Sequence, residues 1–119
     1  MLTVYGIKTC DTVRKALKWL DAQGIPHTFH DVRADGLDAA TCRRWVEALG
    51  WESVLNRRST TWRNLPESDR KTLDADRVVH LLVAHPTLVK RPVFEEKSLI
   101  QLGFGDDSRA RLSRKVTRI

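Results

Sequence analysis

The chain has 119 residues and a mass of 13.6 kDa; 41% of its residues are hydrophobic, 30% are charged, and the net charge is +6. This length and composition fit one domain with its own core and exclude a collagen-like or largely disordered chain. The longest apolar run, residues 78–84, contains a histidine and is too short to cross a bilayer. The N-terminal residues lack the charged and apolar regions of a secretion signal, so we expect neither a membrane span nor secretion.

The first third of the chain predicts a strand, a helix and a second strand. Residues 2–5 are rich in β-branched and aromatic side chains and stop at Gly6. A helix follows Cys10, because apolar residues then recur at the spacing of one helical face: Val13, Ala16, Leu17 and Leu20. Gly24 ends this helix, and residues 27–32 form the second strand. The order is that of a βαβ unit with a right-handed crossover.

The middle of the chain predicts helices. Asp38 caps a helix whose apolar face ends before Gly50 and is formed by Cys42, Trp45, Val46 and Leu49. Residues 51–72 read as short helices joined by loops, and a further helix ends before His85. We place this helical insertion at approximately residues 38–84.

The last third predicts a β-hairpin from residues 93–95 and 99–102, followed by a helix from Asp106. A βαβ unit, a helical insertion, a hairpin and a helix together fit a small mixed sheet covered by helices. We therefore predict an α/β fold: a thioredoxin-like mixed four-stranded sheet with a helical insertion, in a single domain spanning residues 1–119.

The final helix carries much of the positive charge, in Arg109, Arg111, Arg114, Lys115 and Arg118. A basic tail can attract anions or nucleic acid. No aromatic residues alternate with these side chains, as base stacking would require. We expect a solvated terminal helix, without nucleic acid as a partner.

Cys10 is the most informative residue of the sequence. It lies between the end of a strand and the start of a helix, where unpaired backbone N–H groups and the helix dipole favour the thiolate. Lys8 adds a cation two positions upstream. The alternative is a small apolar side chain that fills the turn. Because the thiolate is the reactive form of cysteine, we predict that Cys10 is a nucleophile.

The sequence offers Cys10 no neighbouring second thiol. A thioredoxin-type dithiol has its second cysteine three positions on, and Val13 occupies that position here. Cys42, the other cysteine, lies on an apolar helical face and is predicted to be a core residue. A one-cysteine site needs an external thiol, such as glutathione, to complete a redox cycle. Two cysteines are too few for a disulfide scaffold, so we expect a reducing, cytoplasmic compartment.

Two arginines are candidates for anion binding. Arg91 precedes Pro92, which restricts it to an extended conformation and could aim its guanidinium at a carboxylate or oxyanion. Arg57 is the second candidate, with a solvated surface position as an equal alternative. Arg58 and Arg63, also in the insertion, are predicted to be surface residues. His27 and His30 lie three apart on a strand and point to opposite faces, so we predict no metal site.

Four segments together resemble the ArsC/Spx family of arsenate reductase-like proteins, and most closely its YffB-like branch. These segments are Tyr5–Thr12, Leu55–Arg57, Thr60–Arg63 and Lys90–Val93. The resemblance spans nearly the whole chain and implies a thioredoxin-like fold with a helical insert. It also implies that Cys10 is the nucleophile and that Arg57 and Arg91 match two oxyanion-holding arginines of the family. A cis peptide bond before Pro92 is implied as well.

The chain departs from the family pattern in two places. Arsenate reductases of this type have a His-Asn-Pro run before the cysteine, where this chain has Gly6-Ile7-Lys8. Their third arginine falls in the region that here reads Gly103-Phe104-Gly105. The arsenate pocket is therefore incomplete, and Val13 removes the CxxC switch that Spx-type regulators often carry.

We predict a glutathione-dependent thiol–disulfide reductase with Cys10 as its catalytic residue and Lys8, Arg57 and Arg91 binding anionic groups. We expect no tightly bound cofactor, with glutathione as co-substrate. The expected partners are glutathione or a small thiol or disulfide, with a protein partner left open, and the expected state is a monomer without membrane contact. Two alternatives stay open: an arsenate reductase, and an Spx-like regulator that binds RNA polymerase without catalysis.

Overall fold

The computed structural model describes residues 1–97 and 99–116, with side chains as far as Leu112. The chain divides into two compact units. One unit, which we call the sheet unit, comprises Met1–Asp31 and Arg91–Ile119. The other, the helical unit, comprises Val32–Lys90. The predicted insertion at 38–84 lies within the helical unit, which extends beyond it at both ends.

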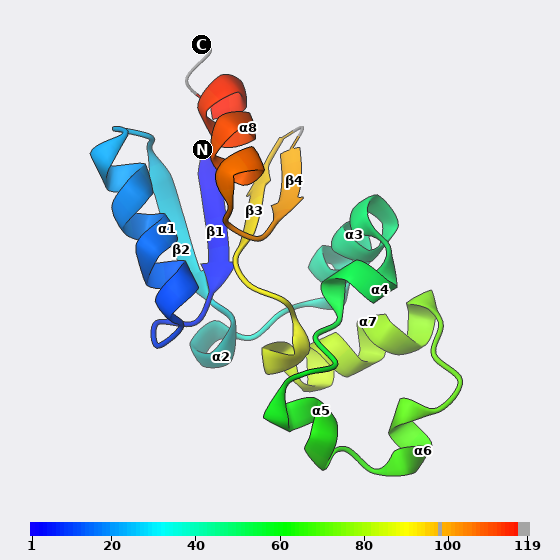
Figure 1. The fold of residues 1–119 in the computed structure, drawn as a ribbon. Coiled ribbons are helices and arrows are strands. Elements are labelled where there is room, and N and C mark those ends of the chain that lie inside the picture. The colour runs from blue at the N-terminus through cyan, green and yellow to red at the C-terminus, as the bar shows by residue number, and fades with distance from the viewer. Residues whose placement is uncertain (98, 117–119) are drawn as a thin grey trace. The chain divides into compact units, whose positions relative to one another are not determined.

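The sheet unit contains a four-stranded mixed sheet of order β2-β1-β3-β4 (Figure 1). The central strand β1 runs parallel to β2 and antiparallel to β3, and β3 and β4 form an antiparallel hairpin. The elements of this unit are β1 (Leu2–Gly6), α1 (Asp11–Ala22), β2 (His27–Asp31), β3 (Val93–Glu96), β4 (Leu99–Leu102) and α8 (Asp106–Val116). The predicted mixed four-stranded sheet is confirmed.

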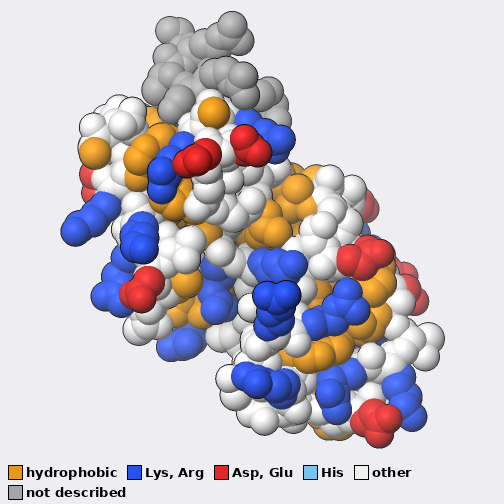
Figure 2. All heavy atoms as spheres, viewed as in Figure 1, with side chains coloured by type: hydrophobic (Ala, Val, Ile, Leu, Met, Phe, Trp, Pro, Cys, Tyr) orange, Lys and Arg blue, Asp and Glu red, His pale blue; other side chains and the backbone are white. Residues whose placement is uncertain are grey.

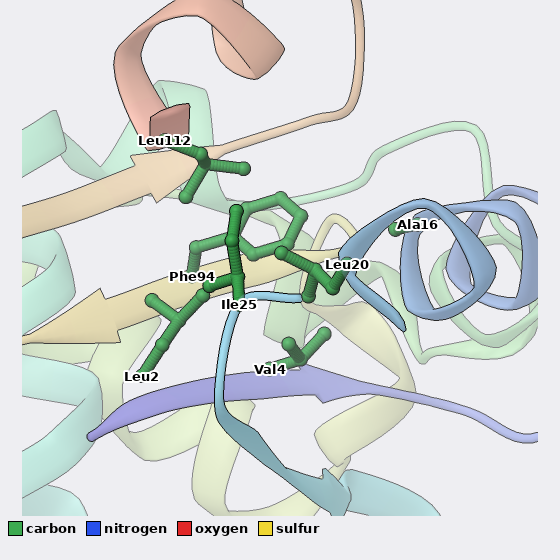
Figure 3. Packing of buried hydrophobic residues seen from close by; sticks show 7 residues of the cluster. All are labelled: Leu2, Val4, Ala16, Leu20, Ile25, Phe94 and Leu112. Carbon is green, nitrogen blue, oxygen red and sulfur yellow. The ribbon is translucent and has the colours of Figure 1, made fainter. Parts of the chain in front are cut away.

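The core of the sheet unit lies between one face of the sheet and the helices α1 and α8. Alternate residues of β1 are buried because successive side chains of a strand point to opposite faces. Phe94 pairs with Val4 in the β1–β3 register and is fully buried. The cluster shown in Figure 3 consists of Leu2, Val4, Ala16, Leu20, Ile25, Phe94 and Leu112. Helix α1 contributes the apolar face that the sequence periodicity predicts.

The helical unit is built from short helices. These are α2 (Val32–Asp35), α3 (Ala39–Leu49), α4 (Trp51–Val54), α5 (Thr60–Asn64), α6 (Glu67–Arg70), α7 (Ala75–Ala84) and the 3-10 helix η1 (Pro86–Leu88). Asp38 caps α3 by accepting the Thr41 N–H at 2.8 Å, as predicted, and Asp74 caps α7 in the same way. Helix α3 packs against α7, and Trp45 is fully buried.

Residue 32 departs from the sequence prediction. We predicted that the second strand includes Val32, but β2 ends at Asp31 and Val32 begins helix α2. The neighbouring strand β1 ends at Gly6, whose register partner is Asp31, so Val32 has no strand beside it. The chain turns instead, and the Val32 carbonyl accepts the Gly36 N–H at 3.0 Å.

Helix α8 carries the first part of the basic C-terminus. The Arg109 guanidinium lies 4.5 Å from the centre of the Phe104 ring and 3.6 Å from the Asp106 carboxylate. Arg111 is exposed, while the predicted solvation of the Arg114, Lys115 and Arg118 side chains lies outside the described residues. In the part of the chain that the structure describes, no helix is both long and apolar enough to span a bilayer.

Candidate active site

Cys10 lies at one edge of the sheet. Two neighbouring pairs define this edge: Gly6 at the end of β1 lies beside Asp31 at the end of β2, and Tyr5 lies opposite Val93 at the start of β3. The chain leaves β1 here and reaches Cys10 through a short turn. The carboxyl ends of β1 and β2 and the amino end of β3 therefore lie at the same end of the sheet as the turn that carries the sulfur.

Arg91 and Pro92 reach the same edge from the other direction. Both belong to the sheet unit and directly precede β3, whose first residue is Val93. The peptide bond between Arg91 and Pro92 is cis. The Pro92 carbonyl accepts the Gly103 N–H at 2.9 Å, which ties this segment to the end of β4. Arg91 is half-buried at this position.

Cys10 is the N-cap residue of α1. Its N–H donates to the Ile7 carbonyl at 3.0 Å, which closes the turn, and its own carbonyl accepts the Arg14 N–H at 3.0 Å, the first bond of the helix. The Cys10 side chain is half-buried, and its sulfur makes no capping hydrogen bond. The N–H groups of the first helical turn have no acceptor inside the helix, so a thiolate at the N-cap is favourably placed.

The charges next to Cys10 are balanced locally. Asp11 follows the cysteine directly and places a carboxylate beside it. The Arg14 guanidinium contacts that carboxylate at 2.8 Å and lies 3.5 Å from the Thr9 carbonyl, so it bridges the residues on either side of Cys10. The Lys8 side chain is exposed. The acidic side chain that follows Cys10 is thus paired with Arg14.

Val13 occupies the position of a second thiol and is fully buried. A Cβ atom added to Gly6 would lie 2.6 and 2.8 Å from the two methyl carbons of Val13. The close approach of β1 and α1 therefore depends on the absence of a side chain at residue 6. Val13 is a packing residue, as its place on the apolar face of α1 predicts.

The second cysteine lies in the helical unit. Cys42 is fully buried on α3, as its spacing predicts. Burial raises the pKa of the Cys42 thiol to about 11, and the Asp38 carboxylate acts in the same direction, with a smaller opposing effect from a backbone hydrogen bond. Cys42 is therefore protonated at neutral pH and shielded from reagents.

Because Cys42 is buried, we predict that the folded chain loses stability at alkaline pH. The folded chain keeps this proton up to about pH 11, while the thiol of the unfolded chain releases it around its ordinary pKa of 9.0. The protonated thiol therefore contributes roughly 2 to 3 kcal/mol to the free energy of unfolding. This contribution is fully present below pH 9.0 and is lost as the pH rises through about 11. Urea unfolding at pH 8 and pH 11 measures this loss. We expect Cys42→Ala to lose less stability over this interval than the wild type; equal losses would contradict the assignment.

Arg57 belongs to the helical unit, whereas Lys8, Cys10, Arg91 and Pro92 belong to the sheet unit. Its side chain is exposed, and its guanidinium lies 5.7 Å from the centre of the Trp51 ring. The structure thus brings four of the predicted site residues into one unit and assigns the fifth to the other.

The backbone before Arg57 is anchored within the helical unit. Leu55 forms a β-bridge with Val89, and the Asn56 N–H donates to the Leu88 carbonyl at 2.7 Å. Arg58 and Arg63 are exposed, as predicted for surface residues. Figure 2 shows Lys and Arg side chains spread over the visible face of the region that α3 to α7 occupy in Figure 1. A spread of this kind is typical of a solvated surface.

The histidines lie as their spacing predicts. His27 pairs with Leu2 and His30 with Tyr5 in the parallel register, so the two point to opposite faces of the sheet. The His27 Nδ1 lies 2.8 Å from the Ile25 carbonyl. Within residues 1–97 and 99–116, no group of three or more His, Cys, Asp or Glu residues could hold a metal ion.

Two charged residues of this edge were not predicted from the sequence. Arg14 carried a weak signal, because it follows Asp11 by three positions on a helix. Asp31 is only 7% exposed although it is an acid, and it accepts the Lys8 N–H. The sequence shows only an acidic residue near the end of a predicted strand, and that position does not by itself indicate burial.

The family model for the ArsC family matches residues 5–112. The chain belongs to the ArsC family. A solved structure of a YffB protein is 41% identical with a TM-score of 0.89, and the match covers 93% of this chain and 97% of that one. A solved arsenate reductase (ArsC) related protein from Brucella melitensis is 44% identical with a TM-score of 0.72, and the match covers 92% of each chain.

Regulators are also among the proteins that this chain is similar to. The global transcriptional regulator Spx of Streptococcus pneumoniae is 26% identical over 109 residues, which cover 90% of this chain and 81% of that protein. The resemblance to the ArsC/Spx family, seen in the Cys10 turn and the Arg-Pro step, is thereby confirmed, and so is the thioredoxin-like fold. The similar proteins include both arsenate reductase-related proteins and regulators, so similarity alone does not decide the function of this chain.

Proposed function

We propose that this protein is a thiol–disulfide reductase that uses a single thiolate, that of Cys10, together with glutathione. The observation that carries the proposal is the place of Cys10: it is the N-cap of α1, half-buried at the sheet edge where Arg91 and Pro92 precede β3. The turn offers no second thiol, because Val13 is buried against Gly6. An external thiol is then needed to release the product.

The reaction has two exchange steps. In the first, the Cys10 thiolate attacks the glutathione sulfur of a mixed disulfide; the bond between Cys10 and glutathione forms, the old disulfide bond breaks, and the substrate leaves as a thiolate. In the second, a glutathione thiolate attacks the glutathione sulfur bound to Cys10. Oxidised glutathione forms and the Cys10 thiolate is restored, so two electrons pass from glutathione to the substrate.

Cationic groups would bind and orient the anionic glutathione. Lys8 and Arg91 belong to the same unit as Cys10, and we assign them to the glutathione carboxylates. The proposal needs no tightly bound cofactor. It places the protein, as a monomer, in the reducing cytoplasm, where glutathione keeps thiols reduced.

The test compares two substrates with one protein. Glutathione consumption is followed with a small glutathionylated thiol and, separately, with arsenate. We expect turnover of the mixed disulfide well above the uncatalysed exchange and at least about tenfold above turnover of arsenate, because the chain lacks a histidine and an arginine of the arsenate reductase pattern. Faster turnover of arsenate would make the protein an arsenate reductase. No turnover of either substrate would overturn the proposal.

The 26% identity to Spx supports one alternative, a regulator that binds RNA polymerase without catalysis. A pull-down with purified RNA polymerase tests it, using the wild type and the Cys10→Ser variant. Under the reductase proposal we expect no stable complex with either protein. Binding that is equal in both proteins, together with absent turnover, would favour the regulator.

A further inference from the structure

Asp31 is a buried carboxylate at the edge of the sheet that carries Cys10. It ends β2, lies beside Gly6 in the parallel register and is 7% exposed. Burying an ionised carboxylate costs free energy unless hydrogen bonds or charges compensate it. A shorter polar or apolar side chain could end a strand without that cost. The position therefore indicates a specific role for this side chain.

Asp31 forms a hydrogen bond with the Cys10 turn. Its Oδ2 accepts the backbone N–H of Lys8 at 3.3 Å. The Cys10 N–H donates to the Ile7 carbonyl at 3.0 Å in the same turn. One bond closes the turn locally, and the other ties its middle to the neighbouring strand. Since only Ile7, Lys8 and Thr9 separate β1 from Cys10, a displacement of Lys8 would displace the sulfur as well.

We propose that Asp31 is a positioning residue for the Cys10 thiolate. Through the Lys8 N–H it holds the turn that presents the sulfur at the N-terminus of α1. The expected effect of Asp31 on catalysis rests on the proposed function. The role requires an acceptor at the right distance rather than a negative charge, so asparagine, whose Oδ1 can accept the same N–H, preserves it. Alanine does not.

Both Asp31→Asn and Asp31→Ala remove the carboxylate charge. Asp31→Asn keeps an acceptor oxygen and Asp31→Ala removes it, so the difference between the two variants reports the acceptor and not the charge. The other charged groups of the turn and of the elements packed around it stay the same in both variants: Lys8, Asp11, Arg14 and Arg91.

The experiment has two readouts that need no substrate, and turnover of the mixed disulfide is a third. Hydrogen exchange of the Lys8 amide reports the bond to Asp31, and the pH profile of Cys10 alkylation by iodoacetamide reports the thiolate. Relative to Asp31→Asn, we expect Asp31→Ala to exchange the Lys8 amide at least about tenfold faster and to turn over the mixed disulfide about tenfold more slowly. Asp35→Ala, which removes an exposed acid from α2, is the matched control and should resemble the wild type.

Equal Lys8 exchange and equal turnover in Asp31→Asn and Asp31→Ala would overturn the inference, as would losses that only follow the unfolded fraction at the assay temperature. If Asp31→Ala does not fold, Asp31→Ser replaces it, because the serine hydroxyl is too short to reach the Lys8 N–H and the same differences are expected. If the wild type turns over no disulfide, the proposed function fails, while Lys8 exchange and the alkylation profile still decide the role of Asp31.

Discussion

Replacing Cys10 with serine is expected to lower glutathione-dependent turnover at least about a thousandfold. A serine hydroxyl keeps its proton at neutral pH, so the turn loses its nucleophile while its backbone keeps the same hydrogen bonds. The remaining cysteine cannot replace it, because Cys42 is fully buried and its pKa is raised to about 11. Initial rates with a small glutathionylated thiol measure the effect.

Cys42→Ser is the matched control for this substitution. It changes the same atom in the other unit, and we expect turnover per folded molecule within about threefold of the wild type. Circular dichroism checks that both variants are folded. A Cys10→Ser protein that keeps a tenth or more of the wild-type rate would place the nucleophile elsewhere.

Replacing Gly6 with alanine is expected to lower the free energy of unfolding by about 2 to 3 kcal/mol. The new methyl group would lie 2.6 and 2.8 Å from the two methyl carbons of Val13, so β1 and α1 must separate. Because α1 begins directly after Cys10, this separation also moves the sulfur. We therefore expect turnover to fall along with stability. Urea unfolding and disulfide turnover measure the two effects.

A double-mutant cycle tests the cause. Val13→Ala removes both methyl carbons and costs about 2 kcal/mol as a cavity. In that background we expect Gly6→Ala to cost less than about 1 kcal/mol, because only the Val13 Cβ position, 3.3 Å away, still crowds the added group. Additive costs would show that the Gly6 substitution acts through some contact other than Val13.

Much of the sheet unit could be predicted from residues near one another in the sequence. The alternation in β1 and the helical spacing from Val13 to Leu20 are local patterns, and each element buries the face that its pattern indicates. The place of Cys10 at a strand-to-helix junction could also be predicted, because local patterns indicate both the strand before it and the helix after it. The helix was predicted to follow Cys10, and Cys10 is its N-cap.

The arrangement around the sulfur depended on pairs that are far apart in the chain. Asp31 came to lie beside the Cys10 turn only because β2 pairs with β1 in one parallel register. Val32 became helical because β1 ends at Gly6 and leaves it no partner strand. Periodicity therefore determined which elements form and which faces they bury, since both follow from local side-chain spacing. Strand register and close packing decided which polar groups surround Cys10, because those contacts join residues that no local pattern connects.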